Sequence, residues 1–473
     1  MRGIDTLRRA LPSTMGMPLR LAPVTVLAGC ITLAKPPTSD ELAGQVLPDG
    51  SPAPSHWTAG GTTPGSVEAG WLATFADTDL DALVAEALAH NADLQAAAAR
   101  VEQAAGYVRA AGGKLYPSLN FLARGGNELA DNSGLEGGLI SASWELDVWG
   151  RVRYAKRGAN AQYAASEADF AYARQSLAAL VAKSWFLATE ATVQRRVASD
   201  MVDAAAKLLE LAEQRFRVGA ASELDVTTAR INLDTYRDGL RQLDLSRDQA
   251  LRSLELLVGR YPAAALAPAA ELGVLPPGAP AGLPSELLER RPDLLAAEQR
   301  VAAAFNLARE AKAARLPSFS LTASVSDLSS EFFVLKNRDN PVWSLGGSVF
   351  APLFNGGELK AKVEIRTAEQ KEAMAHYVQT ALKAFGDVEN ALSSEYALAD
   401  REQILNAAVA DAERALQLAQ TRYRIGSGDL RQVEQQQLAY YSSRMNLLRV
   451  QSDRRVQRVN LHLALGGDFA PSA

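Results

Sequence analysis

The residue types that ordinarily carry enzyme chemistry are sparse in this chain, and no familiar motif arranges them. Its four histidines stand far apart, without an H-E-x-x-H or comparable ligand spacing. The single cysteine, Cys30, excludes an intrachain disulfide and any cysteine-based metal site. Neither a phosphate-binding P-loop nor a G-x-S-x-G nucleophile motif occurs. We therefore expect no catalytic residue, no metal site and no cofactor, apart from a covalent group on Cys30.

The residues around Cys30 have the order of a secretory signal. Several arginines precede a short apolar stretch, residues 21–27, and the small pair Ala28-Gly29 comes directly before Cys30. This order is similar to a bacterial lipobox, in which the signal, here residues 1–29, is removed and the cysteine thiol is acylated. Cys30 is thus the predicted lipidation site. Three methionines are candidate starts of the chain: Met1, Met15 and Met17.

Charge and hydropathy narrow the class of protein further. Charged residues make up 22% of the chain and its net charge is −5, which argues against nucleic-acid binding because that function needs a clustered basic surface. No run of eighteen apolar residues occurs, so we expect no transmembrane helix. Any contact with a membrane must then come from an anchor or from β-strands.

An internal repeat divides the chain into two tandem copies. Residues 91–121 match residues 291–321 at a fixed offset of 200, and eleven of the 31 positions are identical. Two further segments match at an offset of 207: RFRVGAASELDV at 215–226 and RYRIGSGDLRQV at 422–433. We therefore expect a duplicated fold in which the same turn occurs once in each copy.

The positions of proline mark two long helical blocks. No proline occurs in residues 118–261 or 353–470. In each block we expect a helix that starts just after Gly150 or Gly357, runs to the repeated turn and is followed by a second helix. Residues 151–217 alone make 67 positions, which span roughly 100 Å as one helix. Helices of this length must lie side by side as a coiled-coil-like tube or rod.

Between the helices, the period of the apolar residues changes from 3.6 to 2. Four segments alternate in this way: residues 119–123, 140–148, 319–325 and 343–353. Such alternation with neighbouring aromatic residues is typical of strands in a membrane barrel, although a half-buried sheet in a soluble domain has the same pattern. Because the smallest membrane barrels have about eight strands, four strands form either an open sheet or a share of a barrel built from several chains.

These signals predict the order of domains and the fold class. The predicted segments are a signal peptide at 1–29, a lipidated leader at 30–75, a first repeat at 76–261, a proline-rich linker at 262–286, a second repeat at 287–467 and a tail at 468–473. The leader is rich in Pro, Gly, Ser and Thr, so we expect it to be extended rather than packed. Each repeat should contain a helix, two strands, a long helix, the turn and another helix, which makes the fold class α+β.

Taken together, these features resemble the outer-membrane efflux channels of the TolC/OprM type. The cysteine signal, the tandem repeat and the two turns carry the resemblance over residues 70–467. The segment GLPSELLERRPDLLAAEQRV at 282–301 is similar to the lipoprotein branch called NodT-like. The resemblance implies a homotrimer in which each chain gives four strands to one twelve-stranded barrel in the bacterial outer membrane. The helices of the three chains would form a tapering tunnel through the periplasm.

The same resemblance implies a passive duct for drugs or other small molecules, with no catalytic residue. Its implied partners are two further copies of the chain, a periplasmic adaptor protein, an inner-membrane efflux transporter of the RND type and outer-membrane lipid. Ile31 follows Cys30 where an aspartate commonly holds lipoproteins at the inner membrane, which implies retention at the outer membrane.

In this family the repeated turns form the periplasmic tip, where the tunnel narrows and opens. The family's tip aspartate matches Asp225 and its tip tyrosine matches Tyr423. The resemblance implies that these two are partners in a hydrogen-bond network that holds the tip shut. Gly219 and Gly426 match the turn glycines, since a left-handed helix end favours glycine, and Gly428 is a third glycine of the turns.

The chain departs from the family pattern at the constriction. The arginine that completes the network in the TolC branch falls at Gly428, which leaves Arg424 or Arg431 as substitutes. The acidic positions of that branch are Gln432 and Gln435, and the narrowing leucine of the OprM branch is Arg431. We hypothesise that Arg431 and Gln435 of three chains line a polar throat.

A second class of function was weighed against the duct. A lipid-anchored periplasmic coiled-coil scaffold or adaptor would use the same anchor and would place the strands in a soluble sheet. Two long helical hairpins without another β-rich region disfavour this alternative. A hydrolase has no nucleophile–base pair to support it.

Overall fold

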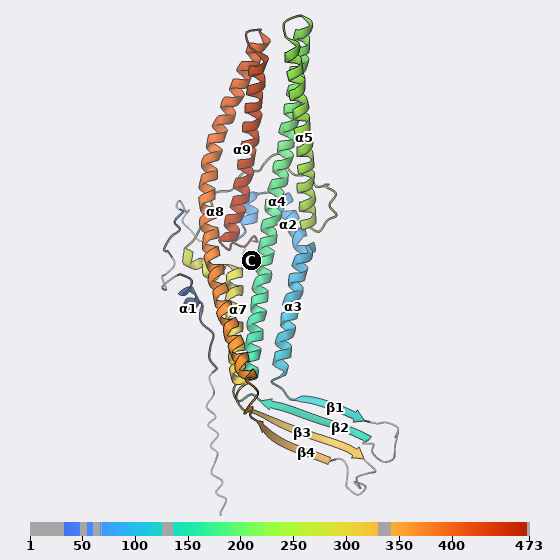
Figure 1. Ribbon diagram of the computed structural model, residues 1–473, viewed down its shortest axis with the longest axis vertical. Coiled ribbons are helices and arrows are strands. Elements are labelled where there is room, and N and C mark those ends of the chain that lie inside the picture. The colour runs from blue at the N-terminus through green and yellow to red at the C-terminus, as the bar shows by residue number, and fades with distance from the viewer. Residues whose placement is uncertain are drawn as a thin grey trace, which may run out of the picture. The chain divides into compact units, whose positions relative to one another are not determined.

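The computed structural model describes residues 33–47, 54–59, 67, 69–124, 136–329 and 342–470 (Figure 1). The chain separates into two compact units, Met1–Ala34 and Lys35–Ala473, and the second unit contains all elements discussed below. Cys30 and the signal peptide expected at residues 1–29 lie outside the described residues, so both stay predictions.

The second unit contains two copies of one order of elements. The first copy consists of α2 (Thr78–His90), α3 (Ala92–Gly113), β1 (Ser118–Arg124), β2 (Glu136–Leu146), α4 (Arg151–Arg217) and α5 (Glu223–Leu257). The second consists of η3 (Pro284–Glu286), α6 (Leu287–Arg290), α7 (Pro292–Ala313), β3 (Ser318–Ser329), β4 (Val342–Phe350), α8 (Glu358–Arg424) and α9 (Leu430–Ala464). Two short elements precede them, α1 (Ser39–Ala43) and η2 (Trp71–Phe75). Matching helices have equal lengths of 22, 67 and 35 residues, which confirms the duplication.

The two longest helices, α4 and α8, begin after the predicted glycines. Gly150 and Gly357 precede them with φ of 78° and 89°, which glycine adopts without steric cost. The carboxylate of Asp147 caps α4 by accepting the backbone N–H groups of Val152 and Arg153 at 2.9 Å. The pairs α4–α5 and α8–α9 form hairpins, and α4 also packs against α7 and α9 (Figure 1). Among the described helices, none is both long and apolar enough to cross a membrane.

The four strands form one antiparallel sheet in the order β1-β2-β3-β4. The register places the apolar members of the alternating pattern in common rows, for example Leu119, Ala142, Ala323 and Leu345. The next row is polar and consists of Asn120, Ser141, Ser324 and Ser344. The hydroxyl groups of the last two lie 2.6 Å apart. Because successive side chains of a strand point to opposite faces, one face of the sheet is apolar and the other is polar, as predicted.

The predicted ends of two strands are wrong. β2 ends at Leu146 rather than at residue 148, because Asp147 leaves the sheet to cap α4. β4 ends at Phe350 rather than at residue 353. Pro352 accounts for this difference, since proline has no N–H group to donate to a neighbouring strand.

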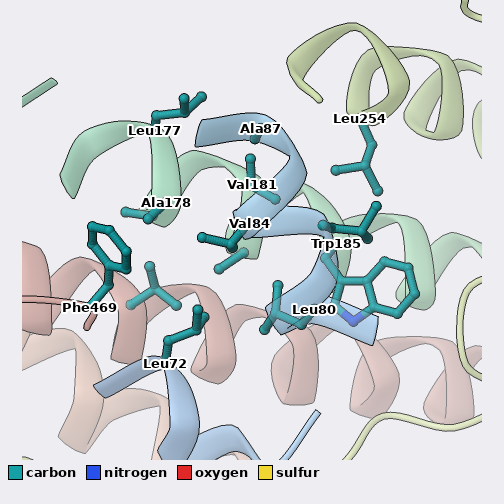
Figure 2. Close-up of a cluster of buried hydrophobic side chains, with 14 of the residues drawn as sticks. Leu72, Leu80, Val84, Ala87, Leu177, Ala178, Val181, Trp185, Leu254 and Phe469 are labelled. Atoms are coloured by element: carbon teal, nitrogen blue, oxygen red, sulfur yellow. The ribbon is translucent and has the colours of Figure 1, made fainter. Parts of the chain in front are cut away.

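Apolar residues from distant parts of the sequence form the first core cluster. Leu80 of α2 and Trp185 of α4 lie in it together (Figure 2). Trp71 and Phe75 of η2 belong to the same cluster, and so does Phe469 beyond the last helix. Residues on both sides of the boundaries expected at 75/76 and 467/468 therefore contribute to one core.

The leader, expected to be extended, packs against the second repeat in its described parts. Leu42, Val46 and Trp57 are buried in the second core cluster, which also contains residues of α7, α8 and α9. The Trp57 indole N–H donates to linker carbonyls at 3.2 Å. The carboxylate of Glu389 accepts the N–H groups of the two residues after Trp57 at 2.8 Å. Each buried large side chain contributes about 2–3 kcal/mol, which offsets part of the conformational entropy lost when the segment is ordered.

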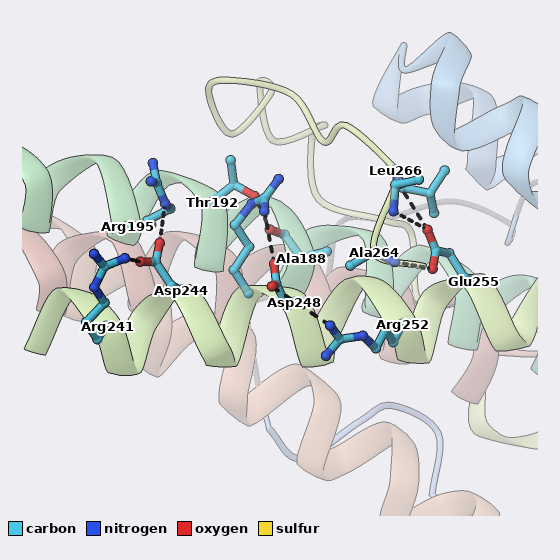
Figure 3. Close-up of polar contacts among 12 residues, drawn as sticks. Ala188, Thr192, Arg195, Arg241, Asp244, Asp248, Arg252, Glu255, Ala264 and Leu266 are labelled. Carbon is cyan, nitrogen blue, oxygen red and sulfur yellow. Dashed lines mark hydrogen bonds and ion pairs between the residues drawn. The ribbon is translucent and has the colours of Figure 1, made fainter. Parts of the chain in front are cut away.

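Between α5 and η3, the proline-rich linker expected at residues 262–286 is held by charged side chains rather than by helices or strands. Glu255 near the end of α5 is 1% exposed and accepts three successive N–H groups, residues 264–266, at 2.6 to 3.2 Å (Figure 3). Arg458 of α9 is 2% exposed and donates to two linker carbonyls and to Glu395 of α8. Backbone groups that have no ladder partner thus gain hydrogen bonds from buried side chains.

Candidate functional site

The two repeated turns join the helices of each hairpin with the same backbone geometry. Gly219 has φ of 76° and Gly426 has φ of 82°, so both occupy the left-handed region. The residue after each glycine donates its N–H to a carbonyl five positions back, at 2.8 Å to Arg215 and 3.0 Å to Arg422. This hydrogen bond closes the end of a helix at a left-handed residue. The turn therefore requires glycine at these two positions.

Gly428 serves a different purpose from the other two glycines. Its φ is not positive, but a Cβ atom placed on it would lie 2.9 Å from the backbone nitrogen of Tyr423 and 3.0 Å from the carbonyl carbon of Arg422. A side chain at this position would displace the backbone that carries Tyr423. The arginine that the TolC branch has here therefore has no room in this turn.

Asp225 caps its own helix. Its carboxylate accepts the backbone N–H and the hydroxyl of Ser222, each at 2.8 Å, while the Ser222 hydroxyl accepts the N–H of Asp225 at 3.2 Å. This reciprocal arrangement is a capping box, which stabilises the start of α5. In the second turn, Asp429 accepts the N–H of Arg431 at 2.8 Å and caps α9 more simply.

Tyr423 lies at the junction of the two hairpins but does not bond to Asp225. Its side chain is buried at 4% exposure, and its hydroxyl group has no hydrogen-bond partner among the described residues. The hydrogen bond predicted between Tyr423 and Asp225 is therefore not formed within the chain, because Ser222 engages the carboxylate. Burial raises the pKa of the Tyr423 phenol, and Asp225 adds to the increase.

Arg215, from the first turn, holds Tyr423 instead. Its guanidinium group lies over the Tyr423 ring at 4.5 Å from the ring centre, and its Nη1 donates to the Tyr423 carbonyl oxygen at 2.6 Å. A cation–π contact and a charge-assisted hydrogen bond thus join the first hairpin to the second. We call this pair the Arg215–Tyr423 contact.

An apolar cluster drawn from all four long helices surrounds the contact. Its buried members are Ala212, Val226, Ala229, Leu416, Ala419, Tyr423, Leu430 and Val433. The Tyr423 ring is the one aromatic member of this list, and Arg215 covers it from the side of α4. The two hairpins therefore contact each other through Tyr423 of the second repeat.

The residues predicted to line the constriction are exposed in the chain. Arg424, Arg431, Gln432 and Gln435 all lie at the surface of the second turn and of the first turns of α9. Between them, Glu434 is half-buried, and burial raises the pKa of its carboxyl group, with repulsion by Asp225 as a further cause. Among the described residues, no group of three or more potential ligands is arranged to hold a metal ion.

Sequence reasoning missed Arg215. At the repeat offset of 207, Arg215 corresponds to Arg422, so the two turns carry the same arginine beside an aromatic residue. This repetition indicates that an arginine has a structural role at the tip. It did not indicate which copy reaches across, and the family pattern suggested Arg424 or Arg431 of the second turn instead.

Comparisons with known proteins identify the architecture. The family model described as "Outer membrane efflux protein" matches residues 83–260 and 283–467, one segment for each repeat. The pyoverdine export outer membrane protein OpmQ of Pseudomonas aeruginosa is 33% identical over 442 residues, which cover 89% of this chain and 93% of OpmQ. The cation efflux system protein CusC of Escherichia coli K12 is 28% identical over 462 residues, which cover 94% of this chain and 100% of CusC.

Solved structures agree with these sequence relatives. The outer-membrane channel OprN superposes with a TM-score of 0.80 at 26% identity, covering 90% of this chain and 98% of that one. A crystal structure of CusC gives a TM-score of 0.76 at 27% identity, covering 88% and 98%. The two hairpins and the four-stranded sheet are therefore the fold of an outer-membrane channel.

Proposed function

The chain belongs to the outer membrane efflux protein family and is an outer-membrane exit duct, and we propose that three copies build one channel. The open sheet carries this proposal. β1 and β4 each have one edge without a strand partner among the described residues, and every residue of β4 is exposed. Since about eight strands are the fewest that close a membrane barrel, three copies would give a closed barrel of twelve.

The apolar face of the sheet would then contact lipid, and the polar face would line the lumen. An acyl chain on Cys30 would add an anchor, which the mass of the mature N-terminal peptide would reveal. No catalytic step is part of this function, because a passive duct needs none. Because the chain belongs to a family of outer-membrane channels, we do not retain the alternative of a periplasmic scaffold or adaptor.

Cysteines on the two outer strands should crosslink neighbouring copies. With Cys30 retained, a chain carrying Phe121→Cys on β1 and Leu345→Cys on β4 is expected to give dimers and trimers in outer-membrane fractions, and nothing larger, with a flexible thiol crosslinker. The matched control carries Ser141→Cys and Ser324→Cys, which face each other within one chain and should give monomers alone. Crosslinked species larger than a trimer, or no crosslinked species at all, would contradict the trimer.

The tip also offers a contact for a periplasmic adaptor coupled to an RND transporter. Val218 and Ile425 are 78% and 73% exposed and stand just before the turn glycines of the two hairpins. Exposed apolar side chains at corresponding places mark an interaction surface. A photo-crosslinker on Ser427→Cys should capture an adaptor together with its transporter, whereas the same probe at Gln379→Cys, far down α8, should not. Equal capture at both positions would refute docking at the turns.

Arg431 should set the ion selectivity of the closed or partly open throat. Because a charge at a narrow opening attracts the oppositely charged ion, Arg431→Glu is expected to shift single-channel selectivity towards cations by about two- to tenfold. Arg431→Ala should lie between that variant and the parent chain, and Arg431→Lys should resemble the parent. If neither Arg431→Ala nor Arg431→Glu changes conductance or selectivity, Arg431 does not line the throat.

A further inference from the structure

A groove lies between the two hairpins next to the Arg215–Tyr423 contact. It has a volume of about 530 Å³, within the range of small-molecule sites. We call it the tip groove, and its lining consists of Asp200, Asp203, Ala204, Lys207, Leu208, Leu211, Gln420, Tyr423, Arg424, Val433, Gln437 and Tyr441. These residues come from α4, α8 and α9, so the groove exists only while the hairpins lie together.

The lining has Asp200 and Asp203 at the end away from the turns and Arg424 at the end nearest them, with Lys207 one helical turn from Asp203. α4 runs towards the turns and ends at Arg217, which places Asp203 and Asp200 about 21 and 25 Å from that end at 1.5 Å per residue. Tyr441 is the groove residue of α9 that lies farthest from the turn. Burial raises the pKa of Tyr441 to about 12, with Asp200 as the next cause, so this carboxylate acts near the phenol.

The end nearest the turns carries the guanidinium group of Arg424, although the carboxyl groups of Asp225 and Glu434 also act on the Tyr423 phenol there. Arg424 is the last residue of α8 and lines the groove beside Tyr423. The buried Tyr423 hydroxyl, without a partner among the described residues, is a donor that lacks an acceptor. A buried donor of this kind is costly to leave without an acceptor, so a ligand that supplies one is favoured. Both groups therefore favour an oxygen acceptor, and a carboxylate suits them best.

Between the two ends the lining is apolar, with Leu208, Leu211 and Val433. Asp200 and Asp203 form no ion pair among the described residues, and so they are free to receive a cation. We propose that the tip groove binds an elongated zwitterion, with an ammonium group at Asp200 and Asp203, an apolar body along α4 and a carboxylate at Tyr423 and Arg424. Lys207 lies between the two ends.

Occupancy of the groove would act on the gate. Tyr423 belongs both to the groove and to the Arg215–Tyr423 contact, so a ligand there stabilises the arrangement in which the hairpins are joined. This part of the inference rests on the expectation, implied by the family resemblance, that the channel opens and closes at the tip. A bound zwitterion should therefore reduce the open fraction of the channel.

Calorimetry on the purified full-length protein in detergent tests the groove itself. The probe is 8-aminooctanoate, and octanoate and octylamine are its one-ended analogues. We expect 8-aminooctanoate to bind about tenfold or more tightly than either analogue, since each charged end contributes about 1–2 kcal/mol. Asp200→Asn with Asp203→Asn should reduce its affinity to that of octanoate, and Arg424→Gln should reduce it to that of octylamine. Equal affinity for all three probes, or no binding, would overturn the proposal.

Single-channel recording distinguishes binding in the groove from an effect of that binding on channel opening. If 8-aminooctanoate lowers the open fraction of the parent chain and has no effect on the Asp200→Asn, Asp203→Asn variant, both proposals hold. Binding by calorimetry with an unchanged open fraction would uphold the groove and refute its link to the gate. Tyr423→Phe keeps the ring under Arg215 but removes the hydroxyl, and it should weaken binding about fivefold or more. Unchanged affinity in this variant would refute the assigned carboxylate end.

Discussion

Replacing Arg215 by alanine is expected to open the tip. The variant loses the guanidinium over the Tyr423 ring and the 2.6 Å hydrogen bond to the Tyr423 carbonyl. Together these contacts are worth about 1–3 kcal/mol for a partly buried pair. If they act only when the hairpins are joined, their loss shifts the closed–open equilibrium by about five- to 150-fold per chain. Three chains per channel would increase the effect.

Channel recordings in planar bilayers provide the measurement. Arg422→Ala is the matched control because Arg422 occupies the same place in the other turn, is exposed and is not the residue that covers Tyr423. Arg215→Ala should raise mean conductance strongly, and Arg422→Ala should leave it near that of the parent. The combination of Arg215→Ala with Tyr423→Leu should add little to either single change, because both remove one contact. Equal conductance for the two arginine variants would exclude Arg215 from the gate.

The long helices could be predicted because residues close to their ends in the sequence determine where they begin and end. The absence of proline and the presence of Gly150, Gly357 and the repeated turns specify where α4 and α8 begin and end, and no tertiary contact is needed to locate these positions. The strands were predicted for the same reason, since alternation is a local pattern. The end of β2 was not predicted, because Asp147 leaves the sheet to cap α4.

The packing of the leader and tail could not be predicted from period or composition. Trp57 and Phe469 stand singly among small and polar residues, and Trp71 begins a stretch of only five residues with Leu72 and Phe75, so none of them produces a long helical or strand period. Each is buried only because distant helices supply a surface, such as the cluster that receives Trp71 and Phe469. A large aromatic residue in an otherwise polar leader was the available signal, since such side chains are costly to leave in water.

The tip shows the same limit at the candidate site. The glycines were predicted from the turn itself, whereas the Arg215–Tyr423 contact depends on how two hairpins separated by about two hundred residues pack. The family analogy supplied Asp225 as the partner of Tyr423. In the chain, Ser222 competes for that carboxylate by forming a local capping box, and the local interaction prevails.

His462 should make the protein lose stability in mild acid. Its imidazole is 8% exposed and stacks on Trp71, with ring centres 5.6 Å apart and an angle of 14° between the planes. Burial, together with the positive charge of Arg458, lowers the pKa of His462 to about 4. An unfolded chain would have a histidine pKa near 6.5. Between these values the unfolded chain binds a proton that the folded chain excludes.

The sign of the effect follows from this difference. Above about pH 6.5 both states hold a neutral imidazole, so His462 costs nothing. As the pH falls below that value, the unfolded state gains protons first and the free energy of unfolding decreases, by about 2 kcal/mol at pH 5 and about 3 kcal/mol near pH 4. The loss ends only when the folded state is protonated as well.

Urea unfolding in detergent at pH 7.5 and pH 5.0, followed by tryptophan fluorescence, measures the loss. His462→Phe retains a ring to stack on Trp71 but has no titratable group, so this variant should lose about 2 kcal/mol less between the two pH values than the parent chain. His376→Phe is the control, because His376 lies exposed on α8 and its removal should leave the pH dependence of the parent intact. If His462→Phe and the parent lose equal stability, the buried imidazole is not the group that titrates.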